Sequence, residues 1–386
     1  MASSEAFPRG RTSIVAAAKF GIGLTPGYSS IDMAVHASLD ALGQVGLTPA
    51  DVDGLFIALP DDFMSGLSLA EYFGIQPRVM DNNRIGGSSF QSHVMWAALA
   101  LEHGLCDVAL LAYGSNQRSG AGGLVSAMKQ PYYESPYKLA RPAGAYALAT
   151  NRYKHVYGLE AEQLGAVAIA ARQWAMQNPE AMLRDPLTME DYLASRLVAD
   201  PLRVRDCCLI TDGAAAIVMT RADRARDLVT RPAHILGAAF ETDHRDITSM
   251  PDLTVTSAVR AGQRAYAQAG VGPKDIDVVE LYDAFTINTI LFLEDLGFCA
   301  KGEGAAFVAS GAISPGGALP VNTNGGGLSC VHPGMNGMFT IVEAVEQVMG
   351  RCGERQIDDT QLALAHGNGG ELSSQAVVIL GSDQTL

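Results

Sequence analysis

Positive charge is scarce in this sequence. Its 27 Lys and Arg residues face 41 Asp and Glu residues, so the formal net charge at pH 7 is -14. Without an overall positive field, little attracts phosphates from a distance, which argues against nucleic acid and against an anionic membrane as partners. An anionic ligand must be held by local cations, and the candidates in loops are Arg84, Lys129, Lys138, Arg141 and Arg152.

Paired cysteines and long apolar runs are absent. The six cysteines are scattered, with no C-x-x-C pair and no spacing typical of a zinc ribbon or a disulfide framework. We therefore expect no metal in this chain and a reducing compartment. The N-terminal segment mixes charged residues such as Arg11 and Lys19 into short apolar stretches, which predicts neither a signal peptide nor a membrane span. A cytoplasmic protein is the expectation.

Apolar residues, in contrast, are abundant. They make up 48% of the 386 residues, while charged residues make up 18%. A chain of this length exceeds what one hydrophobic core usually supports, so two domains or two fused halves are expected. The apolar composition favours extensive buried sheet and a buried interface between subunits, which predicts a homodimer or a larger oligomer.

An internal repeat supports two related halves. Residues 41–56 (ALGQVGLTPADVDGLF) correspond to residues 265–280 (AYAQAGVGPKDIDVVE), with Ala, Gln, Gly, Pro and two Asp residues at the same positions in each copy. In both copies an Ala-rich helix ends at a Gly, a Pro begins an acidic turn, and an apolar strand follows. One helix-to-strand unit is thus used twice.

A second correspondence begins at glycine-rich loops. Residues 82–89 (NNRIGGSS) lead into a helix that extends to Gly104, followed by a strand over 108–112. Residues 322–327 (NTNGGG) lead through His332 into a helix around 339–349, followed by a strand over 362–365. Alternating helices and strands predict an α/β fold with mostly parallel sheets covered on both faces, and with chemistry at strand ends and helix N-termini.

The segment between these units has no counterpart in the second half. We predict an inserted loop region at about 117–201, within an N-terminal half at 1–225, and a C-terminal half at 226–386.

Two glycine-flanked histidines are the main candidates for catalysis. His332 precedes Pro-Gly, and His366 precedes Gly-Asn-Gly-Gly at a strand end, where an imidazole has few packing partners. The alternative for either is a packed, structural histidine. Ser88, in the loop Gly86-Gly87-Ser88-Ser89, is either a helix N-cap or a nucleophile.

The motifs together resemble the thiolase superfamily, specifically its sterol-carrier-protein-type branch. The resemblance covers nearly the whole chain and is carried by motifs in a fixed order: Tyr146 to Ala149 with Arg152-Tyr153, Asn178-Pro179, Asp200-Pro201-Leu202, Asp212-Gly213-Ala214, Tyr282 to Thr286, Leu293 to Cys299, Asn322 to Gly327 with His332-Pro333-Gly334, and His366 to Gly370.

The resemblance implies a thiolase-like five-layered αβαβα fold of two duplicated halves, a homodimer, and coenzyme A thioesters as substrates. It implies that His332 activates a nucleophile and that His366 moves the α-carbon proton. Gly87, Gly370 and Asn324 are implied as oxyanion or loop positions, and Asp283 as a hydrogen-bond partner behind the site.

The sequence departs from the family pattern at two positions. Gly87 or Ser88 stands where thiolases carry a nucleophilic cysteine, and Cys330 is a possible substitute thiol. Tyr282-Asp283-Ala284-Phe285 stands where related thiolases carry His-Asp-Cys-Phe. A tyrosine there resembles the thiolase-like aldolases of steroid side-chain degradation, which pair with a small OB-fold, zinc-ribbon protein.

Three hypotheses follow. The first is a thiolase-type acyltransferase that forms or cleaves a C–C bond next to a CoA thioester, with Ser88 or a partner as the acyl acceptor. The second is retro-aldol cleavage of a β-hydroxyacyl-CoA with Tyr282 as acid or base and an OB-fold partner. The third is a non-catalytic CoA-binding scaffold.

Overall fold

Strands from both ends of the chain form one sheet of nine strands. The computed structural model describes residues 7–120 and 132–386. The strand order is β3-β2-β4-β7-β1-β8-β11-β10-β9, and a two-stranded ribbon, β5-β6, stands apart. The junction of the two halves of the sheet is short, because β1 and β8 pair only at Ser13 with His234 and Ile14 with Ala233.

The first part of the chain builds one side of this sheet. Its elements in chain order are β1 (Thr12–Gly23), α1 (Ser30–Gln44), β2 (Gly54–Ile57), α2 (Ser65–Phe73), β3 (Val79–Asp81), α3 (Ser89–Glu102), β4 (Ala109–Ser115) and β7 (Asp212–Arg221). After α7 (Ala222–Leu228), the second part follows a similar order, with an extra helix in the place of β3. Its elements are β8 (Ala233–Thr242), α8 (Ala258–Ala269), β9 (Val278–Glu280), α9 (Thr286–Asp295), α10 (Gly304–Ala309), α11 (Gly337–Met349), β10 (Leu362–Gly369) and β11 (Ser374–Gly381).

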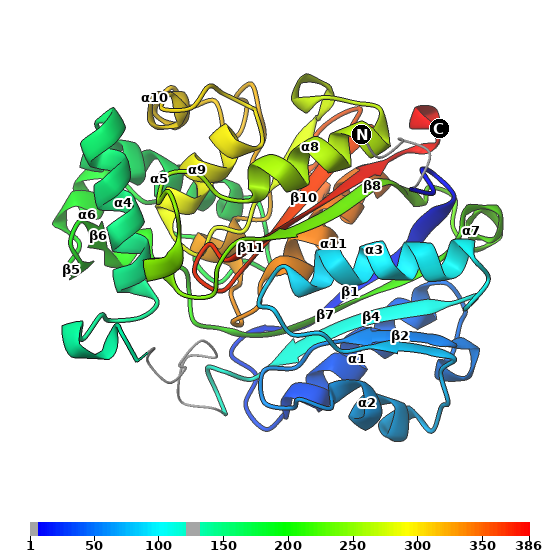
Figure 1. The fold of residues 1–386 in the computed structure, drawn as a ribbon. Coiled ribbons are helices and arrows are strands. Elements are labelled where there is room, and N and C mark those ends of the chain that lie inside the picture. Colours follow the sequence, from blue (N-terminus) through cyan, green and yellow to red (C-terminus); the bar gives the residue numbers. More distant parts are fainter. Residues whose placement is uncertain (1–6, 121–131) are drawn as a thin grey trace.

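Five layers result from this repetition (Figure 1). Helices α1 and α2 cover the outer face of the first half-sheet, α3 and α11 lie together in the centre, and α8 covers the outer face of the second half-sheet. Three buried apolar clusters fill the spaces between layers, and the central one joins residues of α3 and α11 to both half-sheets. The predicted αβαβα class is confirmed.

The strand directions differ from the prediction of mostly parallel sheets. Pairing is parallel only toward the edges, in β3-β2-β4 and in β10-β9. The inner pairs β4-β7, β7-β1, β1-β8, β8-β11 and β11-β10 are antiparallel. The reason lies in the connections: β10 returns through a turn of a few residues into β11, and a short turn can join only antiparallel strands.

The predicted repeat is visible in matching hydrogen bonds. Asp53 Oδ1 accepts from the amides of residues 107 and 108 at 2.8 and 2.9 Å, at the entry to β4. Asp277 Oδ2 accepts from the amides of residues 361 and 362 at the same distances, at the entry to β10. Asp53 therefore links the start of β2 to the start of β4, and Asp277 links the start of β9 to the start of β10 in the same way. This shared role explains why both copies of the repeat contain the aspartate.

The insertion packs against the second half of the molecule. It contains α4 (Ala143–Tyr157), α5 (Ala161–Met176), α6 (Met189–Ala194), β5 (Leu197–Ala199) and β6 (Leu202–Arg203), and part of it, with Lys129, lies outside the described residues. Asn178 Nδ2 donates to the carbonyl of Asn324 at 2.9 Å, so the insertion supports the second glycine loop.

The predicted boundary between the two halves, at residue 225, falls inside α7 and stays a prediction. Over residues 7–120 and 132–386, no helix is both long and apolar enough to span a bilayer.

Candidate active site

The two central helices begin at the same place, and the candidate residues gather there. The loop with Gly87 leads into α3, and the loop with His332 leads into α11. Tyr282 follows β9 and points its hydroxyl at the second loop, where it donates to the Gly334 carbonyl at 2.9 Å and accepts from the Asn336 amide at 3.3 Å. The rings of Tyr282 and His332 meet edge to face, with centroids 5.5 Å apart.

The Tyr282 ring occupies the space beside Gly87. A Cβ atom added at Gly87 would overlap Cε2 of Tyr282 and would lie 2.7 Å from Cδ2 and 2.8 Å from the Asn368 carbonyl oxygen. Real Cβ atoms essentially never approach other heavy atoms so closely. No side chain at position 87 can therefore extend into the site while Tyr282 keeps this position.

Ser88 is buried and committed to protein partners. Its hydroxyl forms a 2.6 Å hydrogen bond with the Ser374 hydroxyl and a longer one to the Ile85 carbonyl. It is the N-cap residue of α3, yet its side chain accepts no capping bond. Among the described residues, no imidazole or other base forms a hydrogen bond with this hydroxyl, so the geometry gives it no activation as a nucleophile.

His332 keeps one ring nitrogen free. Its backbone is fixed, since its amide donates to Thr211 Oγ1 at 3.1 Å and its carbonyl accepts from Gln117 Nε2 at 2.9 Å. Its Nε2 atom is buried without a hydrogen-bond partner in the described part of the chain. Burial lowers the pKa of His332 to about 4, so the ring is a neutral base at physiological pH.

His366 lies within β10, and its ring is fully buried. The ring packs on Phe292 of α9 with centroids 4.2 Å apart. Burial lowers its pKa to about 3. Its carbonyl accepts from Thr340 Oγ1 of α11 at 3.0 Å, and its role in proton transfer stays a prediction.

A chain of hydrogen bonds connects His366 to the last glycine loop. Asn368 Nδ2 donates to the Tyr146 hydroxyl at 3.0 Å, so its Oδ1 accepts from Gln375 Nε2 at 2.9 Å. Gln375 Oε1 then accepts from Nε2–H of His366 at 2.9 Å. The Tyr146 hydroxyl donates to the Gly370 carbonyl at 3.2 Å. This order places the His366 proton on Nε2 and leaves its Nδ1, which is buried without a partner among the described residues, as a free acceptor.

Asp283 organises the loop that carries His332. Its carboxylate is fully buried and accepts from the amides of Gly327 at 2.6 Å and Leu328 at 3.3 Å, within a π-helical turn over Gly326–Cys330. Burial raises its pKa to about 7. Asn324 is used in the same way, because its Oδ1 accepts from the Gly326 amide at 2.6 Å. Both side chains thus hold the backbone of this loop.

Close backbone contact explains two of the glycines. Gly86 has a φ of +89°, and a Cβ there would lie 2.6 Å from Cα of Gly369 and 2.9 Å from N of Gly370. Gly370, at a φ of +64°, begins the turn from β10 into β11. The first and last glycine loops therefore touch directly.

Cys330 does not serve as a thiol in this geometry. Its side chain is part of the central apolar cluster, and its Sγ accepts only a 3.5 Å hydrogen bond from Asn178. Burial raises its pKa to about 12, so the thiolate is not formed at neutral pH. The predicted alternative nucleophile is thus an ordinary buried cysteine.

The predicted cations are divided between structural and exposed positions. Arg141 is bound by the carboxylates of Glu371 at 2.5 Å, Asp246 at 3.2 Å and Glu134 at 3.4 Å, and Arg84 donates to the carbonyls of residues 59 and 60. Lys138 and Arg152 are exposed. Arg84 is exposed as well, so among the described candidates these three residues can reach an anionic ligand.

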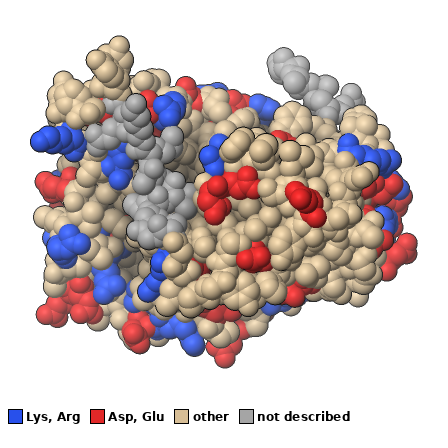
Figure 2. All heavy atoms as spheres, turned by 90° about the horizontal axis from the view of Figure 1, so that it is seen from below, with Lys and Arg blue, Asp and Glu red and all other residues tan. Residues whose placement is uncertain are grey.

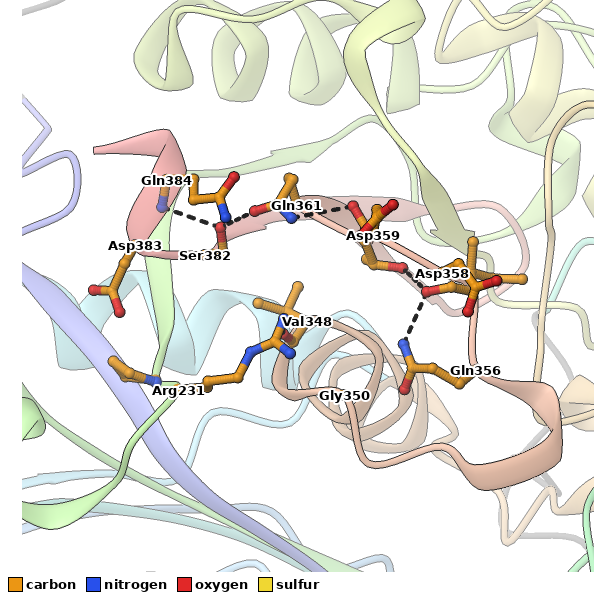
Figure 3. A pocket seen from close by; sticks show the side chains of 13 residues that line it. Arg231, Val348, Gly350, Gln356, Asp358, Asp359, Gln361, Ser382, Asp383 and Gln384 are labelled. Atoms are coloured by element: carbon orange, nitrogen blue, oxygen red, sulfur yellow. Dashed lines mark hydrogen bonds between the residues drawn. The ribbon is translucent and has the colours of Figure 1, made fainter.

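A surface hollow of about 510 Å³ lies away from this site (Figure 3). Arg231, Asp359, Gln361 and Asp383 are among the residues that line it. It lies where β10 begins and β11 ends, whereas the glycine loop lies at the opposite ends of those strands. None of the predicted site residues lines it.

One set of side chains has the composition of a metal site. Glu343, Glu346 and Cys352 bring a ligand atom each to within 4.8 Å of one another. Arg355 already binds Glu343 at 2.8 Å, and Lys19 binds Glu346 at 2.9 Å. Protein cations thus neutralise these carboxylates.

Sequence reasoning missed Asn336, Thr211 and Asn368 as parts of the site. Asn336 contacts the Tyr282 hydroxyl through its amide, Thr211 fixes His332, and the Asn368 carbonyl lies beside Gly87. Asn336 is four residues after His332, in the same turn before α11, and that spacing was the available signal.

A duplicated five-layered fold with a histidine loop and a glycine loop at the starts of both central helices defines the class of thiolase-like enzymes.

Comparisons with known proteins agree with this class. The family model described as "Thiolase C-terminal domain-like" matches residues 239–382. The 17-hydroxy-3-oxo-4-pregnene-20-carboxyl-CoA lyase of Mycobacterium tuberculosis is 39% identical over 86% of this chain and 92% of its own length. A steroid side-chain-cleaving aldolase of Thermomonospora curvata is 36% identical, covering 96% of this chain and 98% of that protein. An acetyl-CoA acetyltransferase of Methanothermobacter thermautotrophicus is 32% identical over 90% and 93%.

Solved structures match as well. The one described as the Ltp2-ChsH2(DUF35) aldolase superposes with a TM-score of 0.88 at 34% identity, covering 97% of this chain and 99% of that one. Human mitochondrial 3-ketoacyl-CoA thiolase, at 17% identity and a TM-score of 0.71, shares the fold. The chain therefore belongs to the thiolase superfamily, in its sterol-carrier-protein-type branch, and is an enzyme of the thiolase or acyl-CoA C–C lyase type.

Proposed function

We propose that this enzyme cleaves a β-hydroxyacyl-CoA by a retro-aldol reaction. The observation that carries the proposal is the position of Tyr282, whose ring fills the space in which a nucleophile at residue 87 would have to lie. Ser88 is committed to Ser374, and Cys330 is buried in the central core. A reaction without an acyl-enzyme intermediate is therefore the one that these residues support.

In this mechanism His332 acts as the base. Its free Nε2 takes the proton of the β-hydroxyl group, a carbonyl forms at the β-carbon, and the electron pair of the Cα–Cβ bond moves onto the α-carbon to give a thioester enolate. The Tyr282 O–H then leaves the Gly334 carbonyl and protonates the α-carbon, and the imidazolium returns its proton to the phenolate. Burial raises the pKa of Tyr282, so this residue donates as a neutral hydroxyl. Neither water nor free CoA is consumed.

The substrate we propose has a bulky, steroid-like acyl group, as the names of the two relatives at 39% and 36% identity indicate for those proteins. For the CoA phosphates we propose the insertion, which carries nine Lys and Arg residues against eight Asp and Glu residues over residues 117–201, although the whole chain is strongly acidic. Figure 2 shows basic side chains toward the end of the molecule that the insertion forms. We further propose a homodimer that acts with a small partner of the DUF35 kind.

The test is product analysis with a β-hydroxyacyl-CoA and no free CoA. The enzyme, with its partner protein, should yield a ketone or aldehyde and a shortened acyl-CoA, and intact-mass spectra should contain no acyl adduct. Tyr282→Phe and His332→Gln should each lower kcat by at least about 10²-fold, since each removes a proton-transfer group. Ser88→Ala should retain activity.

Tyr266→Phe is the matched control, because Tyr266 is also buried but donates to the Leu296 carbonyl in another layer. An adduct on Ser88 together with CoA-dependent turnover would instead support the thiolase-type acyltransferase, the activity named for the relative at 32% identity. Activity that survives both the Tyr282 and the His332 substitutions would contradict the proposal and favour the scaffold hypothesis.

A further inference from the structure

The side-chain oxygen of Asn336 forms no hydrogen bond within the described residues. The residue is 1% exposed, and its backbone amide donates to the Tyr282 hydroxyl at 3.3 Å. Its Oδ1 atom is therefore buried without a hydrogen-bond partner in the described part of the chain. A buried carboxamide oxygen without a donor is costly, so native proteins rarely keep one without a function.

The position of Asn336 makes the free carboxamide more informative. It is the N-cap residue of α11, where an asparagine normally accepts a hydrogen bond from an amide of the first turn, but here no side-chain capping bond forms. Asn324, in the neighbouring loop, does use its Oδ1 locally, on the Gly326 amide. The local backbone thus leaves the Asn336 side chain available to something other than the protein.

Two further uncommitted polar atoms belong to the same region. His332 Nε2, in the same turn, is buried without a partner. Gln91 of α3 donates through Nε2 to the Gly337 carbonyl at 3.0 Å, next to Asn336, while its Oε1 atom is buried without a partner. Uncommitted buried polar atoms near the starts of α3 and α11, where the Tyr282 hydroxyl also lies, are the pattern expected where a polar substrate group completes the network.

We propose that Asn336 is a further catalytic residue, whose carboxamide binds the β-oxygen of the substrate. This inference rests on the proposed retro-aldol function. Nδ2–H of Asn336 donates to the β-hydroxyl oxygen while the hydroxyl proton faces His332 Nε2, and the same bond strengthens as that proton leaves and negative charge develops on the oxygen. The terminal torsion of asparagine is broad and roughly two-fold, so either end of the carboxamide can face the substrate.

The test separates binding from turnover. Wild type, Asn336→Ala and Asn336→Leu are compared, with partner protein present, for kcat and for the Kd of two uncleavable thioether analogues, one with the β-hydroxyl group and one without it. In both variants we expect kcat to fall about 10²-fold to 10³-fold, as for the loss of one oxyanion donor. We expect wild type to prefer the hydroxylated analogue by about threefold to tenfold, and the variants to lose that preference.

Asn83→Ala is the control, because Asn83 is another asparagine whose Oδ1 is buried without a partner but whose Nδ2 donates to the Asp81 carboxylate at 3.0 Å and to the Ser92 hydroxyl at 3.3 Å. It should keep both kcat and the analogue preference. Thermal midpoints should be equal within a few degrees for all variants, since the Asn336 side chain caps nothing.

An unchanged analogue preference in Asn336→Ala would overturn the inference even where the cleavage reaction holds. Failure of the wild type to cleave any β-hydroxyacyl-CoA would instead overturn the proposed function. The binding comparison still decides the role of Asn336 in that case, because it requires no turnover.

Discussion

At the scale of single residues, the position of the Tyr282 ring depends on the absence of a side chain at Gly87. The tyrosine ring needs an empty position beside it, and only glycine provides one. We predict that Gly87→Ala displaces the ring, lowers the unfolding free energy by about 1–3 kcal/mol as other overpacked sites do, and lowers kcat as well. Urea unfolding and the cleavage assay measure the two effects.

Gly43→Ala is the matched control for that prediction. Gly43 lies near the end of α1, where an added Cβ has no heavy atom within 4 Å. The substitution should be neutral or should stabilise the protein by about 0.5–1 kcal/mol, because alanine loses less backbone entropy in a helix. Equal stability and activity for Gly87→Ala and wild type would mean that Tyr282 does not hold this position in solution.

The same pair indicates what sequence can and cannot predict at a site. The order of motifs identified Gly87, Tyr282 and His332 as candidates, because each lies at a strand end or in a loop, where catalytic residues are commonly found. It could not predict that the ring of one fills the space beside another, since the two residues are 195 positions apart and the contact depends on how the half-sheets pack. The direction of the His366 ring was unpredictable for a related reason, because a histidine before Gly-Asn-Gly-Gly has the same local pattern whether its ring faces a ligand or Phe292.

At the scale of elements, Asp283 holds the π-helical turn that precedes His332. Its pKa is raised to about 7, whereas an unfolded aspartate titrates near 3.8. Between about pH 4 and 7 the folded state therefore binds a proton that the unfolded state has released, so this group makes the protein less stable as the pH rises through that range. The whole effect amounts to about 4 kcal/mol at most.

We predict that Asp283→Asn removes this dependence. Relative to wild type, the variant should be destabilised at pH 5, and the difference in unfolding free energy should shift in its favour by about 2–3 kcal/mol at pH 8, because asparagine never becomes charged. Urea titrations at the two pH values measure the shift. Asp51→Asn is the control: hydrogen bonds to Thr48 lower the pKa of Asp51, so its effect should be the same at pH 5 and pH 8. A constant difference for Asp283→Asn would contradict the assigned pKa.

Element order was predictable because the repeat encodes it twice. The spacing of apolar residues predicted the helices and strands correctly in both copies. The paired Asp53 and Asp277 marked the same turn in each. Strand direction was not encoded in the same way, since a continuously apolar strand buried on both faces has the same pattern in parallel and antiparallel pairs. The π-helical turn over Gly326–Cys330 was also unpredictable, because three consecutive glycines allow many conformations and a distant carboxylate, that of Asp283, selects one.

At the scale of the whole molecule, one sheet edge is unprotected. Strand β3 ends the nine-stranded sheet and pairs only with β2. Next to it, at the start of α2, Phe63 is 75% exposed, Met64 48% and Leu67 59%, while Asn82 Nδ2, just after β3, donates to the Phe63 carbonyl at 2.7 Å. Exposed strand edges and adjoining apolar side chains are features that monomeric proteins normally avoid.

We therefore predict that β3 and the start of α2 form the interface of the proposed homodimer, with edge strands from two copies completing each other's hydrogen bonds. Light scattering coupled to size exclusion at micromolar concentration should give the mass of a dimer for wild type and of a monomer for the double variant Phe63→Ser/Leu67→Lys, which places a charge and removes a ring in the desolvated contact. Leu197→Lys, at a 48% exposed position in the insertion, should leave the dimer intact. A monomeric wild type would refute the dimer itself, whereas a dimeric double variant would place the interface on another face and leave the β3 edge to a different partner.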